Sequence, residues 1–191
     1  MVLKEPNCKV WTPEPIVSLM LDMLPTGRIL EPSVGMGAFL KHLPIDAIGV
    51  EIDPNLYQDS RIKYIDFFRY SADEKFDGVI MNPPYLRAKH IPVTTKLYLP
   101  PLSGHANLAY HFVWKSIDHL KPNGVIVAIL PEEIFRATGA VELNKRMYLE
   151  GAITHMVRLK KSPFLPEISQ EVVIIRWQKD NFTHTTEVTY A

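Results

Sequence analysis

The nine residues from Asp77 to Tyr85, DGVIMNPPY, constrain the fold of this chain more than any other stretch. The apolar residues predict a buried strand, and two consecutive prolines prevent further strand pairing directly after Asn82. The strand therefore ends in a rigid turn that holds two acceptors, the Asn82 side-chain oxygen and the Pro83 carbonyl. With the Tyr85 ring as a stacking surface, this turn suits a planar group that carries an NH2.

Predicted strands alternate with predicted helices along the chain. Apolar runs predict seven strands, at residues 28–32, 47–53, 62–68, 77–82, 124–130, 152–159 and 171–177. Residues 185–191 either add an edge strand or fray. The alternation predicts an α/β fold with a doubly wound parallel sheet, which binds its ligands at the carboxyl ends of the strands.

Four helices are predicted between these strands. The first begins at residue 12, capped by Thr12 with Pro13 at its first position. The second follows the glycine-bearing loop at 33–40 and ends at Pro44, and the others occupy 105–121 and 140–149. Residues 86–107 show no periodicity and are expected to form a long exposed loop, which in a compact domain is functional or disordered.

Composition excludes several classes of protein. A chain of 191 residues with 47% apolar content fits one globular domain. Its 21 basic and 21 acidic residues give a formal net charge of zero, so the net charge does not indicate a nucleic-acid partner. The single Cys8 excludes an internal disulfide, and the seven histidines lack metal-ligand spacing, so no metal site is expected. Without an apolar run of membrane-spanning length or a signal peptide, the chain is expected to be cytoplasmic.

Glycines and acids stand where a nucleotide-like ligand could bind. Gly35 and Gly37 allow a tight turn and a close backbone approach, although they could equally serve packing. Glu51, at the end of the second strand, can accept from both hydroxyls of a ribose. Asp66, at the end of the third, can accept from an adenine amine. Both acids could also be solvated strand ends.

The combination of motifs resembles a known family. EPSVGMGAFL at 31–40, GVEIDP at 49–54 and NPPY at 82–85, with Thr12-Pro13 ahead of them, resemble the S-adenosylmethionine-dependent N6-adenine DNA methyltransferases of the gamma class, the TaqI-like enzymes. The resemblance extends from Thr12 to about Trp177. The NPPY motif alone is shared with protein-glutamine and some RNA methyltransferases.

The resemblance implies a Rossmann-like class I methyltransferase fold, with seven strands, an antiparallel last strand at 171–177 and helices on both faces. It implies that Glu31 lies near the cofactor ammonium and that the helix at 12–25 closes over the carboxylate. The implied contacts to S-adenosylmethionine come from Thr12, Pro13, Glu31, Pro32, Gly35, Gly37, Glu51, Ile52, Asp66 and Asn82. Phe164 occupies the place of an aromatic residue that stacks on the target base together with Tyr85.

The implied chemistry is methylation of an adenine N6 amine, which is inaccessible inside a duplex, so the base must be flipped out. Asn82 and the Pro83 carbonyl would accept the two N6 hydrogens, Pro84 would keep the turn rigid, and the methyl group would move in line. The predicted function is a site-specific DNA adenine-N6 methyltransferase of a restriction-modification system. The alternatives are a protein-glutamine or RNA adenine methyltransferase, or a non-catalytic cofactor-binding subunit.

The chain departs from the family pattern after Trp177, where gamma-class enzymes usually carry a target-recognition domain. Residues 1–191 are expected to form a single catalytic domain without that part, either as a fragment or with recognition supplied by a specificity or restriction partner. An unspecific enzyme is the third possibility. DNA binding by the chain alone is therefore expected to be weak. Arg87, Lys89 and His90 could contact phosphates or be merely solvated.

Overall fold

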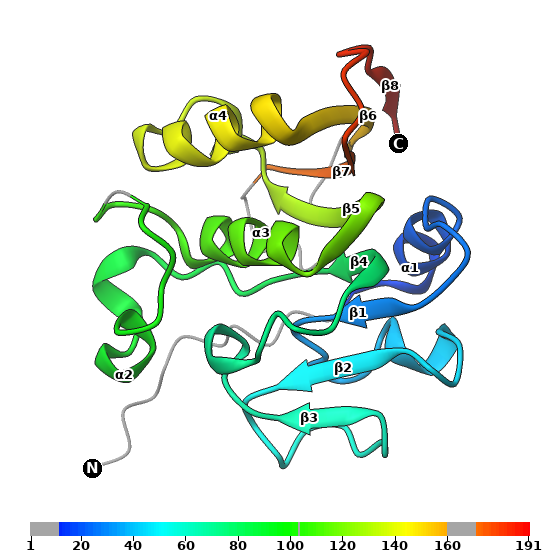
Figure 1. The fold of residues 1–191 in the computed structure, drawn as a ribbon, viewed down its shortest axis with the longest axis vertical. Coiled ribbons are helices and arrows are strands. Elements are labelled where there is room, and N and C mark those ends of the chain that lie inside the picture. The colour runs from blue at the N-terminus through cyan, green and yellow to red at the C-terminus, as the bar shows by residue number, and fades with distance from the viewer. Residues whose placement is uncertain (1–11, 103, 160–170) are drawn as a thin grey trace.

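A single eight-stranded sheet organises the computed structural model, which describes residues 12–102, 104–159 and 171–191. The strand order is β3-β2-β1-β4-β5-β7-β6-β8 (Figure 1). The strands are β1 Ile29–Glu31, β2 Ile48–Glu51, β3 Ile62–Tyr64, β4 Phe76–Met81, β5 Leu120–Pro131, β6 Gly151–Arg158, β7 Val172–Lys179 and β8 Glu187–Tyr190. β7 is antiparallel to both of its neighbours, and the other pairings are parallel.

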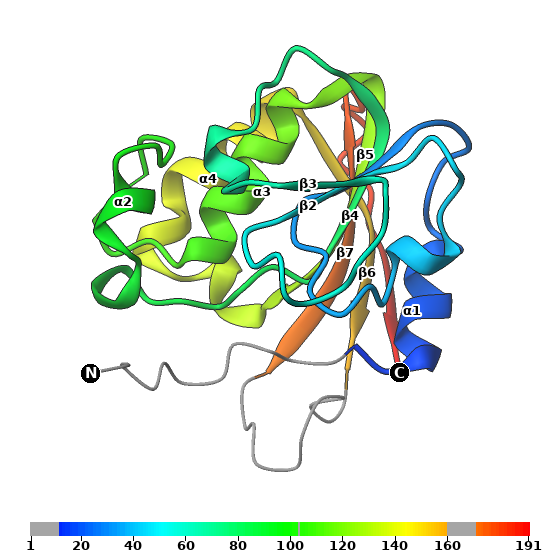
Figure 2. The same ribbon diagram turned by 90° about the horizontal axis from the view of Figure 1, so that it is seen from below.

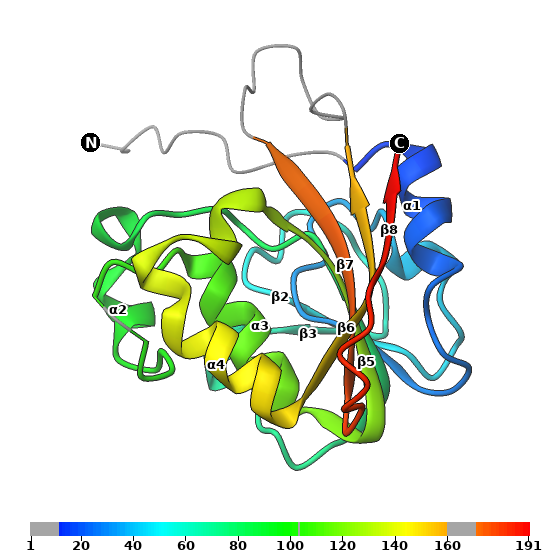
Figure 3. The ribbon, with the colours of Figure 1, turned by 90° about the horizontal axis from the view of Figure 1, so that it is seen from above.

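Helices cover both faces of the sheet (Figures 2 and 3). Helices α3 (Leu108–Asp118) and α4 (Val141–Glu150) lie on one face, and α1 (Glu14–Leu21) lies on the other. The short α2 (Val93–Lys96) lies on the side toward which the arrowheads of β2 and β3 point. No helix among the described residues is long and apolar enough to cross a membrane.

The side chains of strand β5 pack into a hydrophobic core on each face of the sheet. Side chains of a strand alternate between its faces. Ile126, Ala128 and Leu130 belong to the cluster under α3 and α4, whereas Val125, Val127 and Ile129 belong to the cluster on the α1 side. Because both faces are buried, the strand reads as a continuous apolar run. The predicted α/β class, with an antiparallel strand near 171–177 and helices on both faces, is confirmed.

The strand order predicts a crevice between β1 and β4. The chain order runs outward from β1 through β2 to β3 and then returns to β4 on the other side of β1. At such a switch of direction the connecting segments diverge and leave a crevice beyond the carboxyl ends of the strands. Glu31, Glu51 and Asn82 all lie at or directly after those ends.

The prediction of an α-helix between the glycine loop and Pro44 is wrong. The chain forms turns and then only a 3-10 helix, Leu40–His42. Gly35 and Gly37 have positive φ values of 55° and 77°, which are not helical. Pro44 disfavours the helical conformation at the preceding Leu43, whose φ and ψ are −81° and 156°. Residues with non-helical backbone angles therefore bound this stretch on both sides, and too few residues remain between them for an α-helix.

The ends of the chain also differ from expectation. Helix α1 begins at Glu14 with Pro13 at the N-cap position, and its cap lacks a side-chain hydrogen bond. The prediction of Thr12 as the cap is wrong, because its hydroxyl bonds elsewhere. The sheet has eight strands rather than seven, since residues 187–190 pair with β6 as the edge strand β8.

The segment from 86 to 107 is more structured than an exposed loop. It contains the 3-10 helix Ala88–His90 and helix α2, and its Ile91 and Thr95 side chains are buried. The Leu108 amide donates to the Leu86 carbonyl at 2.8 Å, which joins the two ends of the segment. The prediction of an exposed loop is therefore corrected to a segment with one buried side and one exposed side.

Candidate active site

A cavity of about 460 Å³ opens at the carboxyl ends of β1, β2 and β4. This volume lies in the range of pockets that bind cofactor-sized molecules. The sequence-predicted residues that line it are Thr12, Glu31, Pro32, Gly35, Glu51, Ile52, Asp66, Asn82 and Pro84. Pro13, Gly37, Pro83 and Tyr85 do not line it. Phe164 lies outside the described residues, so its stacking role stays a prediction.

Glu51 is held by three backbone amides. Its Oε2 accepts from the Gly35 N–H at 2.7 Å, and its Oε1 accepts from the N–H groups of Ile52 and Asp53 at 2.8 and 2.9 Å. These bonds join the glycine loop to the end of β2. A carboxylate has about four acceptor directions, so Glu51 retains capacity for about one more donor. Its contact with both hydroxyls of a ribose stays a prediction.

Glu31 is buried differently. Its side chain is 1% exposed, and its Oε2 lacks a hydrogen-bond partner among the described residues. Burial raises the pKa of this carboxyl well above 4.5; the nearby Glu51 adds to the rise, and a backbone hydrogen bond from Leu40 opposes it. Because the group lines the cavity, a cationic ligand could supply the missing partner.

Asn82 presents a free acceptor at the end of β4. Its Nδ2 donates to Thr12 Oγ1 at 3.1 Å, which orients the amide. The Asn82 backbone carbonyl accepts from the Ser33 hydroxyl at 3.4 Å. Neither Asn82 Oδ1 nor the Pro83 carbonyl accepts a hydrogen bond from the described part of the chain. Two acceptors at neighbouring residues thus lack a donor among the described residues, and an NH2 group has the two hydrogens that would supply them.

Tyr85 is fixed by packing. Its half-buried ring contacts both core clusters, and its hydroxyl is buried without a partner among the described residues. Burial raises the pKa of this phenol above its usual value, so the hydroxyl stays protonated. A ring held in this way keeps one orientation beside Asn82. Stacking of a substrate on it stays a prediction.

Asp66 is engaged by a residue that sequence reasoning missed. Its Oδ1 accepts from the Phe68 N–H at 2.9 Å, and its Oδ2 accepts from Thr95 Oγ1 at 2.8 Å. Thr95 belongs to α2, so this bond attaches the 86–107 segment to the rim of the cavity. The threonine carries no signal in the sequence, because its partner lies 29 residues away. Contact between Asp66 and an adenine amine stays a prediction.

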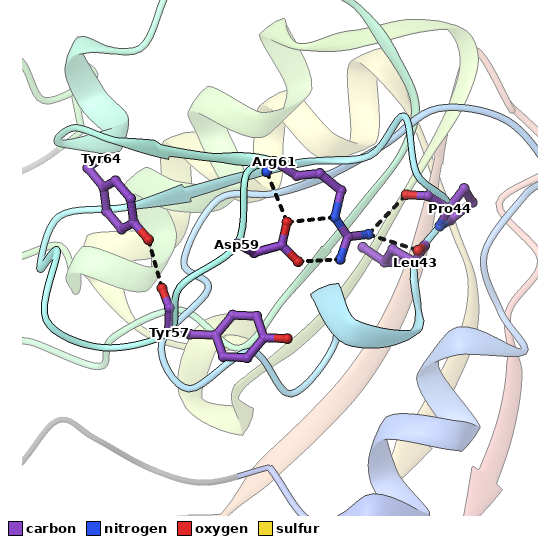
Figure 4. A network of polar contacts seen from close by, with 6 residues as sticks. All are labelled: Leu43, Pro44, Tyr57, Asp59, Arg61 and Tyr64. Atoms are coloured by element: carbon purple, nitrogen blue, oxygen red, sulfur yellow. Dashed lines mark hydrogen bonds and ion pairs between the residues drawn. The ribbon is translucent and has the colours of Figure 1, made fainter.

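The two loop glycines have different surroundings. A side chain at Gly35 would meet open space, whereas a Cβ at Gly37 would lie 2.6 Å from the Tyr57 ring. Gly37 therefore permits close packing on Tyr57, and its contact with a cofactor stays a prediction. Figure 4 shows Tyr57 beside the paired Asp59 and Arg61. Arg61 donates to Asp59 and also to the carbonyls of Leu43 and Pro44, at 2.9 and 3.1 Å, which braces the end of the loop.

Apolar side chains complete the mouth of the cavity. Met36 and Ile52 are 53% and 63% exposed and both line it, although only Ile52 was expected from the sequence. Leu108 and Phe112, from the first turns of α3, close the opposite wall. Large exposed apolar groups at a pocket mouth favour a ligand with a flat apolar part.

The sequence matches the family model of the Eco57I restriction-modification methylase over residues 43–164. It is 28% identical over 183 residues to the type II methyltransferase M.HincII of Haemophilus influenzae, covering 88% of this chain and 36% of that protein. It is 33% identical over 147 residues to the type II methyltransferase M.CvrRI of Paramecium bursaria Chlorella virus XZ-6E, covering 66% of this chain and 37% of that protein. The chain thus spans about a third of the length of these relatives.

Solved structures share the fold. The methyltransferase subunit of a type I restriction-modification system from Streptococcus thermophilus superposes with a TM-score of 0.71 at 21% identity, over 95% of this chain and 47% of that one. A Listeria monocytogenes protein, described as a candidate class I S-adenosylmethionine-dependent methyltransferase, gives a TM-score of 0.73 at 20% identity, over 99% of this chain and 67% of that one. At these identities the likeness establishes the class I methyltransferase fold.

Proposed function

The chain belongs to the Eco57I restriction-modification methylase family, and on that premise we propose that it transfers a methyl group from S-adenosylmethionine to the N6 amine of a flipped-out adenine in DNA. The observation that carries this proposal is the pair of free acceptors, Asn82 Oδ1 and the Pro83 carbonyl, beside a cofactor-sized cavity. An exocyclic amine has two hydrogens to donate, so the pair matches it in number and in polarity.

The cavity fits the cofactor on the chemistry of its own residues. Glu31 provides a buried carboxylate oxygen without a partner, which suits the ammonium of the methionine portion. The open space at Gly35 lets the backbone approach the ligand, and Met36 and Ile52 suit the flat adenine ring. S-adenosylmethionine supplies an electrophilic methyl group on its sulfonium.

The residues at the turn would prepare the target amine. Acceptance of both N6 hydrogens by Asn82 and Pro83 directs the nitrogen lone pair away from them, toward the donor methyl. Thr12 keeps the Asn82 amide in the orientation that accepts, because a rotated amide would point its own NH2 at the substrate amine. Preorganised dipoles of this kind are typically worth about 100- to 1000-fold in rate.

DNA is the proposed partner, and a flipped base would lie against the Tyr85 ring and, as the family pattern implies, Phe164. The relatives are about three times as long as the matched region. We therefore propose that recognition of the DNA sequence involves further residues or a specificity or restriction subunit, with residues 12–191 providing the chemistry.

The test is to incubate the chain with labelled S-adenosylmethionine and with DNA, RNA and protein substrates, and to locate the label by mass spectrometry after hydrolysis. We expect N6-methyladenine in DNA, and its rate of formation should fall about 100-fold or more in Asn82→Ala. Label in glutamine or in RNA adenine would contradict the proposed substrate. Cofactor binding in calorimetry without any methylated product at high DNA concentration would indicate a non-catalytic subunit.

Thr12 offers a finer test of the turn. Thr12→Val removes the acceptor of the Asn82 NH2, whereas Thr12→Ser retains it. We expect kcat to fall about tenfold or more in the valine variant, with the KM for the cofactor changed far less, and the serine variant to recover most of the rate. Equal losses in both variants would contradict the role of the hydroxyl.

A further inference from the structure

One stretch of this neutral chain contains no acidic residue. From Gly78 to Ile117 the sequence contains four Lys and Arg residues and three His, but no Asp or Glu, although the whole chain has 21 residues of each sign. The stretch begins within β4 and includes the turn at Asn82 and helix α2. The net charge of this stretch is therefore positive, and three of its four Lys and Arg residues lie between residues 87 and 96, shortly after the candidate catalytic turn.

The central part, residues 87–96, which we call the basic segment, has two sides. Ile91 is 4% exposed and Thr95 is 6% exposed, and these two side chains face the protein. Arg87, Lys89 and Lys96 are exposed. None of these three forms an ion pair with a residue that the structure describes. Grouped cations without counterions repel one another, and an anionic partner would remove that repulsion.

The basic segment is held against the cavity rather than free. Thr95 donates to Asp66 at 2.8 Å, and Leu86 and Leu108 are joined by a 2.8 Å backbone bond at the base of the segment. Pro92 and Thr95 line the cavity itself. Just beyond the segment, the Arg69 guanidinium lies over the exposed Tyr98 ring, 5.4 Å from its centre, and adds a further cation. These bonds anchor the backbone that carries the three cations to the part of the chain that forms the cavity.

We propose that the basic segment contacts the phosphate backbone of the DNA strand that carries the target adenine, through Arg87, Lys89 and Lys96. This inference rests on the proposed function and assigns a strand-holding surface next to the turn. Phosphate contacts fix the position of a strand without reading its sequence, so the segment would hold the backbone on either side of a flipped base. The cations lie on the exposed side of the same segment that lends Pro92 and Thr95 to the wall of the cavity.

The test is a salt titration of DNA binding by fluorescence anisotropy, with the chain and a fluorescein-labelled mixed-sequence duplex. The variant is Arg87→Gln with Lys89→Gln, and the matched control is Lys145→Gln with Lys179→Gln, on α4 and at the end of β7. The slope of log affinity against log salt should become shallower by about 0.9 for each phosphate that the variant no longer neutralises. We therefore expect a change of about 1.8 in the variant and little change in the control. Lys96→Gln should add up to about 0.9 more.

Two further measurements separate the possible failures. Thermal unfolding and cofactor binding should match the wild type, because the altered side chains are exposed. If the wild type methylates DNA and the variant has the slope of the control, the basic segment is not a phosphate surface, while the proposed function stands. If the wild type methylates no DNA, the proposed function fails, and the slope of the variant still decides the surface. A slope change with single-stranded RNA but not with DNA would overturn the assignment to DNA.

Discussion

Glu31 and Glu51 end two neighbouring parallel strands, and they differ in how their charges are supported. Glu31 lies opposite Gly49, so the two carboxyl groups belong to adjacent strand ends, and both are buried. Glu51 receives three backbone N–H groups, whereas Glu31 retains an oxygen without a partner among the described residues. The same residue type in nearly the same place therefore has two different environments.

The difference indicates that Glu51 has a structural role, whereas Glu31 has an oxygen available for a ligand. Glu51 joins the glycine loop to the end of β2 through bonds to protein groups alone. Glu31 lowers the stability of the free protein, because a buried carboxyl loses its hydrogen bonds to water and its Oε2 gains none from the described residues. Such a group is tolerated where a ligand completes it. Four predictions test this contrast.

The largest effect on stability is expected from Glu51→Gln. An amide has one acceptor oxygen and one NH2, so at least one of the N–H groups of Gly35, Ile52 and Asp53 loses its acceptor. We expect the free energy of unfolding to fall by about 2–3 kcal/mol, measured by chemical denaturation. Cofactor binding should weaken as well, since the loop is no longer held. An unchanged denaturation midpoint would show that the three amides do not depend on the carboxylate.

Glu31→Gln should separate stability from binding. The amide is neutral, so the free energy of unfolding of the free protein at neutral pH should rise. The affinity for S-adenosylmethionine should fall about 10- to 100-fold, because the ammonium loses a charge-assisted bond. Denaturation without cofactor and calorimetry with it measure the two quantities. A variant that is both less stable and unchanged in affinity would remove Glu31 from the ligand site.

The pH dependence of stability should reveal the same group. Since the pKa of Glu31 is raised in the folded state, folding binds a proton between the unfolded value near 4.5 and the folded pKa. Its contribution to stability is full below pH 4.5 and is lost as the pH rises through the folded pKa. The difference in unfolding free energy between wild type and Glu31→Gln should therefore change across this window. A constant difference would mean that Glu31 titrates normally.

The smallest effect is expected from Arg61→Gln. Arg61 donates to Asp59 (Figure 4). Its positive charge also lowers the pKa of Glu31, against the larger rise from burial. The side chains of Arg61 and Asp59 are 13% and 16% exposed, and the substitution leaves Asp59 without its partner, so the free energy of unfolding should fall by about 1–2 kcal/mol. The Arg61 guanidinium also lowers the pKa of Asp59, so this stability is present above pH 3.8 and lost as the pH falls, opposite in sign to Glu31. A loss as large as that in Glu51→Gln would contradict the ranking.

Sequence alone predicted the strands and the acids and turn at the cavity because their signals are local. The apolar runs that form β4 and β5 and the acids that follow β1 and β2 need no distant partner to be read. The bonds of Thr12 to Asn82 and of Thr95 to Asp66 could not be predicted, since each joins residues far apart in the chain. The missing helix after the glycine loop depended on positive φ values that a Gly-x-Gly pattern permits but does not require.

The bond between Thr12 and Asn82 spans 70 residues. The strand and the prolines can shape the turn by themselves, but the Asn82 amide acquires its orientation only when the chain before α1 has returned to the sheet. We expect this bond to form late in folding, because closing a loop of this length costs chain entropy. A chain shortened past Thr12 would keep its sheet, but its cavity would lose one lining residue and its Asn82 amide would be free to rotate. A normal melting curve would therefore not show that the site is intact.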